Sequence, residues 1–332
     1  MRVEVVGAGV AGLTAAYEIA RQGLARGVAV TLVERERAAG LGCSRYAGGM
    51  IAPWCELETA EPIVARLGQE ALDFWITDVP VATRNGSLVV APPREKAELV
   101  DFSRRTESFE ALDARALARL EPDLAQRFDA ALFFVKEAHL EPARAMAALT
   151  ERLRALPNVT LRFNARPSGD ADWTVDCRGF AARDALKRLR GVKGEMLVLR
   201  THEIQLSRPV HMLHARRPAY VVPRGEGLFM VGATMIENEE RARVTARSLV
   251  ELINTAYAIH PAFAEAEIVE TGSDLRPAFP DNLPRLTRRG NTLYLNGLYR
   301  HGFLLAPALA RRAARVLLEG AWFEEVCDED PS

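Results

Sequence analysis

The sequence lacks most of the features that mark metal-binding, membrane or nucleic-acid-binding proteins. Only four of its 332 residues are cysteine, and they form no Cys-x-x-Cys pair and no spacing typical of a metal site. No apolar run approaches the roughly 20 residues of a membrane span. The net charge of −1 argues against a nucleic-acid partner held mainly by charge. We therefore expect a cytoplasmic protein with free thiols and with no metal site, membrane span or nucleic-acid partner.

The composition is that of a globular protein with a substantial core. Hydrophobic residues make up 48% of the chain and charged residues 26%, so disorder is not expected. The length allows one large domain or two interleaved ones.

The first 34 residues contain a dinucleotide-binding pattern. An apolar run from Arg2 to Val6 leads into Gly7-Ala8-Gly9-Val10-Ala11-Gly12, helix-forming residues follow, and a second apolar run ends at Glu34. Gly7 permits a tight turn, Gly9 lets the backbone approach a pyrophosphate, and Gly12 lets the helix pack against the strand. The N–H groups at the start of the helix would face the phosphates.

Glu34 narrows the choice of dinucleotide. An acid at this position accepts hydrogen bonds from a ribose diol and repels a 2′-phosphate, so NADP is disfavoured. The motif alone does not distinguish NAD from FAD.

Two stretches of the chain differ from the rest in their pattern of apolar residues. Residues 76–138 combine short strands, including at best an edge strand around Val79 and Val81, with charged helical pieces. Alternation dominates residues 194–235, and an amphipathic helix follows at 242–258, whereas strands alternate with helices elsewhere. The sequence therefore predicts an α/β protein with two interleaved domains. A discontinuous, Rossmann-like nucleotide domain comprises residues 1–75, 139–193 and 272–332. An α+β domain on a mainly antiparallel sheet comprises residues 76–138 and 194–271.

Four further motifs, in order along the chain, give it a family resemblance. They are Ala47-Gly48-Gly49-Met50-Ile51-Ala52-Pro53-Trp54, then Tyr220-x-x-Pro223-Arg224 with Gly232-Ala233-Thr234-Met235, then Leu275-Arg276-Pro277, and finally Tyr299-Arg300-His301-Gly302-Phe303-Leu304-Leu305-Ala306-Pro307. With the N-terminal pattern, they make the chain resemble the FAD-dependent oxidases of the D-amino-acid oxidase and glycine oxidase family, and most closely the glycine oxidase branch of bacterial thiamine synthesis. The resemblance covers nearly the whole chain and implies a GR2-type FAD-binding domain.

The resemblance implies a cofactor site built from distant segments. The small residues at 47–49 let the backbone lie close to a flat ring. The segment from Arg300 would place a helix N-terminus, with its partial positive charge, beside the flavin, and His301 would act there through its backbone. Arg178 stands where the family often has a small residue, which leaves its contact open. The predicted cofactor residues are Gly7, Ala8, Gly9, Val10, Ala11, Gly12, Glu34, Arg35, Ser44, Ala47, Gly48, Gly49, Met50, Gly179, Arg300, His301, Gly302, Phe303, Leu304 and Leu305.

Four residues match the family's substrate site. Arg276 matches the arginine that pairs with the substrate carboxylate, for which a planar guanidinium is well suited. Tyr220 matches a tyrosine that hydrogen-bonds the same carboxylate, and Met235 a residue that packs over the pocket. Arg300 matches a second arginine, which either shares the carboxylate or guards the entrance.

The resemblance implies non-covalent FAD and the oxidation of glycine, sarcosine or a small D-amino acid. The products would be an imine or 2-oxo acid, ammonia and, with dioxygen as acceptor, hydrogen peroxide, in thiamine (thiazole) biosynthesis and in a homo-oligomer such as a tetramer. Three alternatives stay open: a flavin dehydrogenase that uses another acceptor, an NAD-dependent reductase, and a non-catalytic FAD-binding protein.

Overall fold

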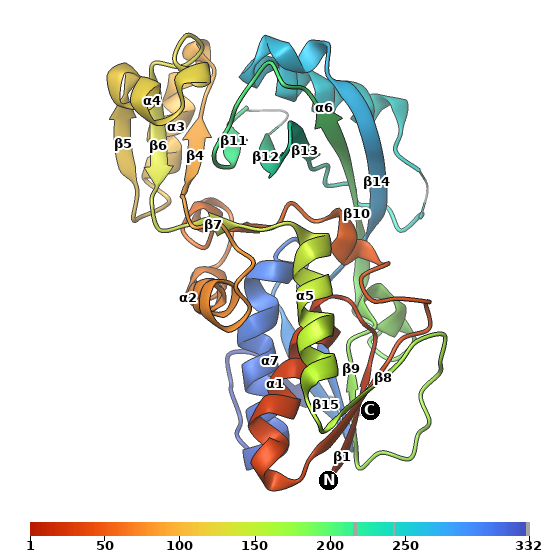
Figure 1. The fold of residues 1–332 in the computed structure, drawn as a ribbon. Coiled ribbons are helices and arrows are strands. Elements are labelled where there is room, and N and C mark those ends of the chain that lie inside the picture. Colours follow the sequence, from red (N-terminus) through yellow and green to blue (C-terminus); the bar gives the residue numbers. More distant parts are fainter. Residues whose placement is uncertain (215–217, 242, 330–332) are drawn as a thin grey trace.

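The computed structural model describes residues 1–214, 218–241 and 243–329, and two sheets dominate it (Figure 1). The first is seven-stranded and lies in the lower half of the view, with both described chain ends beside it. Its pairs are parallel, apart from β15 with β16. From edge to edge its strands are β17 (Cys327–Glu329), β15 (Arg285–Arg289), β16 (Thr292–Asn296), β9 (Trp173–Asp176), β1 (Arg2–Val6), β2 (Ala29–Val33) and β8 (Val159–Arg162).

Three long helices cover this sheet because each has an apolar face. They are α1 (Val10–Gly23), α5 (Pro142–Ala155) and α7 (Gly302–Glu319), and α1 packs directly on both of the others. The buried side chains of Leu13, Leu149 and Leu309 come from their inner faces. α5 begins at a proline, which has no N–H to leave unpaired at the first helical position.

The turn between β1 and α1 requires glycine at two places. Gly7 has φ +99°, a conformation that other residues rarely adopt. A Cβ on Gly12 would lie 1.7 Å from the Gly7 carbonyl oxygen, so helix and turn are in direct backbone contact. The expected strand–turn–helix–strand unit is present, with Gly7 N–H donating to Val33 O at 2.8 Å.

The second sheet has eight strands and occupies the upper half of Figure 1. Its pairs are antiparallel, apart from β11 with β4. From edge to edge its strands are β14 (Glu267–Ala278), β10 (Arg190–Arg200), β13 (Leu228–Gly232), β12 (Ala219–Gly225), β11 (Val210–Met212), β4 (Ser87–Val90), β6 (Ala130–Phe134) and β5 (Glu110–Asp113).

Smaller elements complete the fold. Helix α6 (Ala246–Ile259) packs on β10, β12 and β13, and α2 (Pro62–Asp73) packs on α7. The other elements are α3 (Lys96–Ser103), α4 (Ala114–Leu120), a two-stranded ribbon of β3 (Met50–Ile51) with β7 (Ala138–His139), the 3-10 turns Leu24–Arg26, Cys43–Tyr46, Cys55–Glu58, Pro93–Glu95, Pro122–Leu124, Gly179–Asp184 and Pro261–Ala264, and a π turn at Phe74–Asp78. The predicted class, a Rossmann-like unit with an interleaved, mainly antiparallel sheet, is confirmed.

Two long strands join the halves of the molecule. β10 and β14 pair over their full lengths and run from the second sheet down to the first (Figure 1). The predicted domain boundaries at 193/194 and 271/272 fall inside these two strands, so backbone pairing continues across both positions.

The edge strand expected around Val79 and Val81 is wrong. The chain leaves α2 through the π turn, and the N–H groups of Val79 and Val81 donate back to Phe74 O and Trp75 O. These bonds satisfy the backbone locally, and Pro80 has no N–H to offer a neighbouring strand. α7 begins at Gly302, inside the Tyr299–Pro307 motif.

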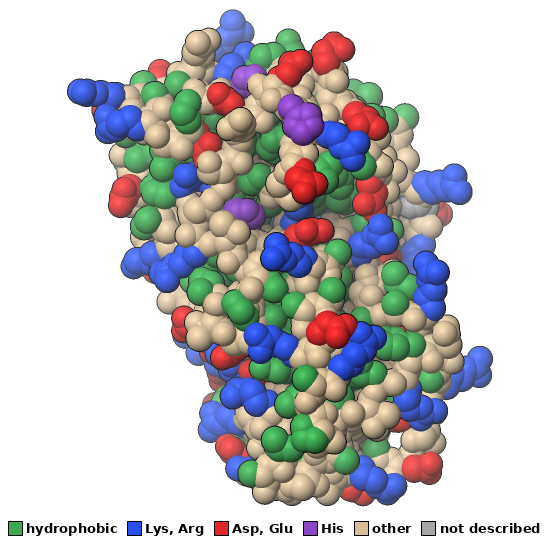
Figure 2. Space-filling view, viewed as in Figure 1, with side chains coloured by type: hydrophobic (Ala, Val, Ile, Leu, Met, Phe, Trp, Pro, Cys, Tyr) green, Lys and Arg blue, Asp and Glu red, His purple; other side chains and the backbone are tan. Residues whose placement is uncertain are grey.

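Charge of neither sign gathers on the face shown in Figure 2. Figure 2 shows basic and acidic side chains interspersed on the face in view. No helix in the described part of the chain is long and apolar enough to span a membrane.

The backbone contact at Gly12 predicts a large effect of a single methyl group. Gly12→Ala should lower the free energy of unfolding by about 3 kcal/mol, because the added Cβ meets a backbone atom that cannot rotate away. Urea unfolding of the apoprotein measures this change. Gly42→Ala is the matched control, since a Cβ there meets nothing within 4 Å. Equal stability of the two variants would contradict the close contact.

Candidate active site

A cavity of about 430 Å³ lies at the end of β1 and is lined by half of the predicted cofactor residues. Glu34 accepts hydrogen bonds from the N–H groups of Ala8 (2.6 Å) and Glu36 (3.0 Å), so its carboxylate lies beside the glycine turn. Ser44 Oγ accepts from Val10 N–H at 3.1 Å. The predicted cofactor residues on its wall are Gly7, Ala8, Gly9, Val10, Ala11, Glu34, Arg35, Ser44, Gly179 and Gly302.

Arg178 also lines this cavity, and its role is now visible. It pairs with Asp176 at 2.7 Å and Asp184 at 2.9 Å. Burial opposes the charge of Arg178, but these two carboxylates raise the pKa of its guanidinium above the ordinary value. Arg178 therefore bridges the end of β9 to the following turn.

A smaller cavity of about 90 Å³ contains the predicted substrate residues. Tyr220, Met235, Arg276 and Arg300 all line it, together with segment 47–50, His301, Phe303 and Leu304. A further space of about 70 Å³ shares Val10, Ser44 and Gly302 with the dinucleotide cavity, and Gly48, Tyr220, Arg276, Arg300 and Phe303 with the substrate cavity. These shared walls connect the two cavities. Gly12 and Leu305 line neither; Gly12 lies under the turn, and Leu305 is fully buried.

Arg276 is held in place but has no anionic partner. Its Nη1 donates to Thr234 O at 2.9 Å, and within residues 1–214, 218–241 and 243–329 it forms no ion pair. A Cβ on Gly194 of β10 would lie 2.4 Å from Arg276 Nη2, so glycine there makes room for the guanidinium. A half-buried arginine without a carboxylate attracts an anion into the cavity.

The Tyr220 ring closes the cavity on the other side. A Cβ on Gly48 would meet this ring at 2.7 Å, which places it against the glycine-rich segment. Burial raises the pKa of the Tyr220 phenol, and the hydroxyl therefore stays protonated and can donate.

Arg300, in contrast, is already paired. Its Nη2 donates to Glu56 Oε2 and to Thr59 Oγ1 (2.8 Å), and its Nη1 lies 3.7 Å from the sulfur of Met235. Burial works to raise the pKa of Glu56, but the charge of Arg300 and the nearby histidines lower it to about 2. Arg300 therefore spans the cavity from segment 56–59 to the half-exposed Met235.

Glu56 and His211 line the cavity but were not predicted. Glu56 directly follows the Ala47–Trp54 motif and Cys55, so its position next to a flavin-type segment was the one available clue. His211 lies opposite Tyr220 in the β11–β12 pair, with its Nδ1 3.5 Å from Cys55 Sγ. Burial lowers the pKa of both His211 and His301 to about 4, so both rings are neutral near pH 7.

No group of three His, Cys, Asp or Glu side chains in the described residues is arranged to hold a metal ion. The four cysteines are unpaired. Cys43 and Cys177 face the dinucleotide cavity, and burial raises the pKa of Cys43 to about 12 and that of Cys177 well above the ordinary value.

A buried acid supports the segment that carries Glu56. Glu137 accepts from the N–H groups of Trp54 (3.1 Å) and Cys55 (2.7 Å) and from Ser87 Oγ. It lies at the start of the Cys55–Glu58 turn, where unpaired N–H groups need acceptors. Burial raises the pKa of Glu137 to about 8.

Comparisons with known proteins show the family of this chain. The family model described as "FAD dependent oxidoreductase" matches residues 2–316. The chain belongs to this family of FAD-dependent oxidoreductases. The expected resemblance to the D-amino-acid oxidase and glycine oxidase group is thus confirmed, and so are FAD as the cofactor and an oxidoreductase as the class of enzyme.

Individual relatives of this FAD-dependent oxidoreductase narrow the group. It is 55% identical to a putative thiamine biosynthesis oxidoreductase ThiO from Rhizobium etli, over 96% of this chain and 97% of the relative. It is 28% identical to a glycine oxidase from Pseudomonas putida, over 99% and 97%. Among solved structures, an iminodiacetate oxidase from Chelativorans shares the fold with a TM-score of 0.84 and 24% identity over the whole of both chains. It is therefore a ThiO-like or glycine-oxidase-like enzyme.

The residues present fit FAD. Glu34 offers a carboxylate beside the glycine turn, and the N-cap of α1 is Gly9, which has no side chain to block an approaching phosphate. α7 begins at Gly302, and the first turn of this long helix faces the space between the cavities. Its N-terminal partial charge can stabilise negative charge there.

The raised pKa of Glu137 predicts a pH-dependent stability. Between the ordinary pKa of 4.5 and about 8 the folded chain keeps a proton that the unfolded chain releases, so stability falls as the pH rises through this interval. Glu137→Gln mimics the protonated acid. It should therefore gain stability relative to the wild type between about pH 5 and about pH 8.5, measured by urea unfolding.

Exposed Glu110 provides the control for this comparison, because Glu110→Gln should shift stability equally at both pH values. The explanation fails if Glu137→Gln shows no more pH dependence than Glu110→Gln relative to the wild type.

Proposed function

We propose that this enzyme oxidises a small amino acid, with glycine as its main substrate and sarcosine or small D-amino acids as related ones. The observation that carries the proposal is Arg276, a guanidinium without a carboxylate partner in a cavity of about 90 Å³. Tyr220, Met235 and Arg300 line the same small cavity as Arg276, which favours a substrate without a large side chain. The names of the relatives, glycine oxidase and thiamine biosynthesis oxidoreductase, support this substrate and a role in thiamine biosynthesis.

Each side chain has one task in this proposal. Arg276 binds the substrate carboxylate through its two N–H donors, and the Tyr220 hydroxyl donates to the same group. This anchoring determines which α-hydrogen faces the space beside Gly48 and Gly49, and orientation of this kind supplies much of the rate enhancement. Arg300, held by Glu56, guards the entrance with Met235.

FAD, when bound, supplies the acceptor for the two electrons and the hydrogen lost from the α-carbon. The substrate amine must be neutral at that moment. His211 and His301 also line the cavity. Because both rings are neutral near pH 7, neither adds a positive charge near the substrate amine. No side-chain base is assigned. The imine product then hydrolyses to a 2-oxo acid and ammonia, and dioxygen is the final acceptor.

The test is a flavin-reduction experiment. Anaerobic glycine should bleach the flavin absorbance of the purified enzyme, and admission of dioxygen should restore it with one hydrogen peroxide per glycine consumed. Flavin that no amino acid in a panel reduces would refute the proposal. Reduction without peroxide would instead indicate a dehydrogenase that uses another acceptor.

The anchoring role of Arg276 makes a quantitative prediction. Arg276→Ala should lower kcat/KM for glycine by about 100-fold or more, because the carboxylate loses a charged partner in a mostly buried site. Gly194→Ala should raise KM, since its Cβ displaces the guanidinium. Steady-state kinetics at fixed dioxygen measure both. Arg200→Ala, on an exposed ion pair of the same sheet, should change neither value.

Wild-type kinetics in Arg276→Ala would exclude the anchor. A lower kcat with unchanged KM in Gly194→Ala would show that the guanidinium acts on the chemical step rather than on binding.

We also propose that FAD is bound non-covalently. Both thiols on the dinucleotide cavity, Cys43 and Cys177, have raised pKa values and are therefore poor nucleophiles. Acid precipitation should release all of the flavin into the supernatant, and yellow colour that stays with the pellet would contradict this.

A further inference from the structure

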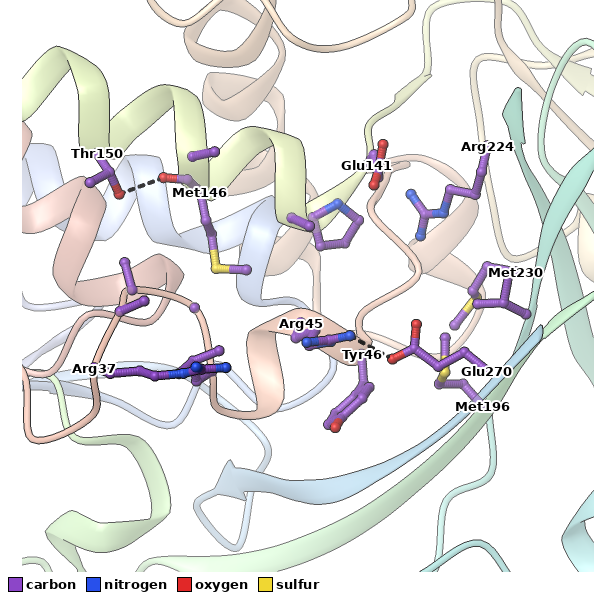
Figure 3. A pocket seen from close by; sticks show the side chains of 18 of the residues that line it. Arg37, Arg45, Tyr46, Glu141, Met146, Thr150, Met196, Arg224, Met230 and Glu270 are labelled. Atoms are coloured by element: carbon purple, nitrogen blue, oxygen red, sulfur yellow. Dashed lines mark hydrogen bonds and ion pairs between the residues drawn. The ribbon is translucent and has the colours of Figure 1, made fainter. Parts of the chain in front are cut away.

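Arg224 belongs to the Tyr220-x-x-Pro223-Arg224 motif, yet the site described above gives it no task. It lies near the end of β12, and its half-buried side chain forms part of the wall of a third cavity of about 600 Å³. Figure 3 shows this cavity, with Arg224 and Glu141 on one side and the Arg45–Glu270 ion pair on another. The Arg224 guanidinium contacts segment 47–49, whose residues also line the substrate cavity.

The guanidinium of Arg224 binds backbone carbonyls from two separate segments. Its Nη2 donates to Gly48 O at 2.8 Å and to Ala47 O at 3.2 Å, and its Nη1 donates to Leu140 O. Burial lowers the pKa of Arg224 to about 10, so the side chain is still charged near pH 7. Hydrogen bonds from a charged donor are stronger than those between neutral groups, so Arg224 clamps the backbone of both segments in place.

This clamp determines where two amide groups point. In a planar trans peptide the N–H points away from the C=O of the same unit. Because Ala47 O and Gly48 O both face Arg224, the N–H groups of Gly48 and Gly49 face the other way, where both residues line the substrate cavity.

These two N–H groups have no hydrogen-bond partner among the residues that the structure describes, although Gly48 and Gly49 are both buried. Buried N–H groups are rarely left unpaired in folded proteins, so their direction points to an acceptor that occupies the cavity. Successive N–H groups on one side of a chain are a common site for electron-rich atoms.

Leu140 ties the same segment from a second direction. Leu140 N–H donates to Gly49 O at 2.8 Å, while Leu140 O accepts from Arg224. Gly49 has φ +72°, and a Cβ there would lie 2.1 Å from Leu140 O. Arg224 and Leu140 therefore hold segment 47–49 from two directions, and a side chain at position 49 would clash with Leu140 O.

We propose that Arg224 is a positioning residue for the cofactor, which orients the Gly48 and Gly49 N–H groups toward acceptor atoms of the flavin ring. This inference rests on the placement of the ring beside segment 47–50, which the proposed function also uses. Arginine suits the task because its planar fork reaches two segments at once, whereas a lysine ammonium on a flexible stem acts as a point charge.

The test measures FAD binding without any substrate. Arg224→Met should raise the dissociation constant of FAD at least about tenfold, because the two donors lose their direction. Arg224→Lys, which keeps the charge but not the fork, should raise it at least about threefold. Titration of apoprotein with FAD, followed by quenching of flavin fluorescence, gives these constants, and the visible spectrum of the bound flavin should shift in both variants.

Arg45→Met is the matched control, because Arg45 lies on the same cavity but pairs with Glu270 at 3.0 Å. It should bind FAD within twofold of the wild type. Unchanged affinity and spectrum in Arg224→Lys and Arg224→Met would overturn the proposal, and so would an equal loss in Arg45→Met. If Arg224→Met does not fold, Arg224→Lys decides. Failure of glycine to reduce a normally bound flavin would count against the proposed function alone.

Discussion

Strands β10 and β14 pair antiparallel from Arg190 to Arg200, and the geometry of the active site depends on this pairing. The pairing carries the second sheet on top of the dinucleotide unit and brings Arg276 of β14 beside Gly194 of β10. The Thr234 carbonyl, just beyond β13 on the other side of β10, then meets the guanidinium at 2.9 Å. A slip of one residue in the register would turn Arg276 to the opposite face of the sheet.

Three arginines around the cavities show how surroundings give one side chain different tasks. Arg276 contacts a backbone carbonyl only, so its charge is available to an anion. Arg300 is neutralised by Glu56. Arg224 meets three carbonyls and acts on the backbone rather than on a ligand. Because Glu56 balances Arg300, the attraction for a carboxylate is concentrated on Arg276.

The order of elements and several site residues could be predicted because their determinants are local. The glycine turn with Glu34, the helices with one apolar face and the motif around Arg276 can each be recognised within a short stretch of chain. The strand around Val79 was predicted wrongly, because its alternation did not reveal that Trp75 O and Phe74 O accept the N–H groups there. Glu137 was missed because nothing in its own neighbourhood distinguishes it from a surface acid. Glu56 was missed because its position after the Ala47–Trp54 motif does not show that it pairs with Arg300.

The sequence by itself determined the strand–turn–helix unit and a dinucleotide as the cofactor class, since both depend on residue types at fixed spacing, and its family resemblance implied FAD and Arg276 as the candidate anchor. The tertiary structure decided which charges are free and which are paired. Glu56 meets Arg300 across 244 positions of the chain, and Glu137 meets Trp54 across 83. The direction of the Gly48 and Gly49 amides depends on Arg224, which is 176 positions from Gly48. Contacts of this kind form only when packing brings distant segments together, and no local pattern encodes them.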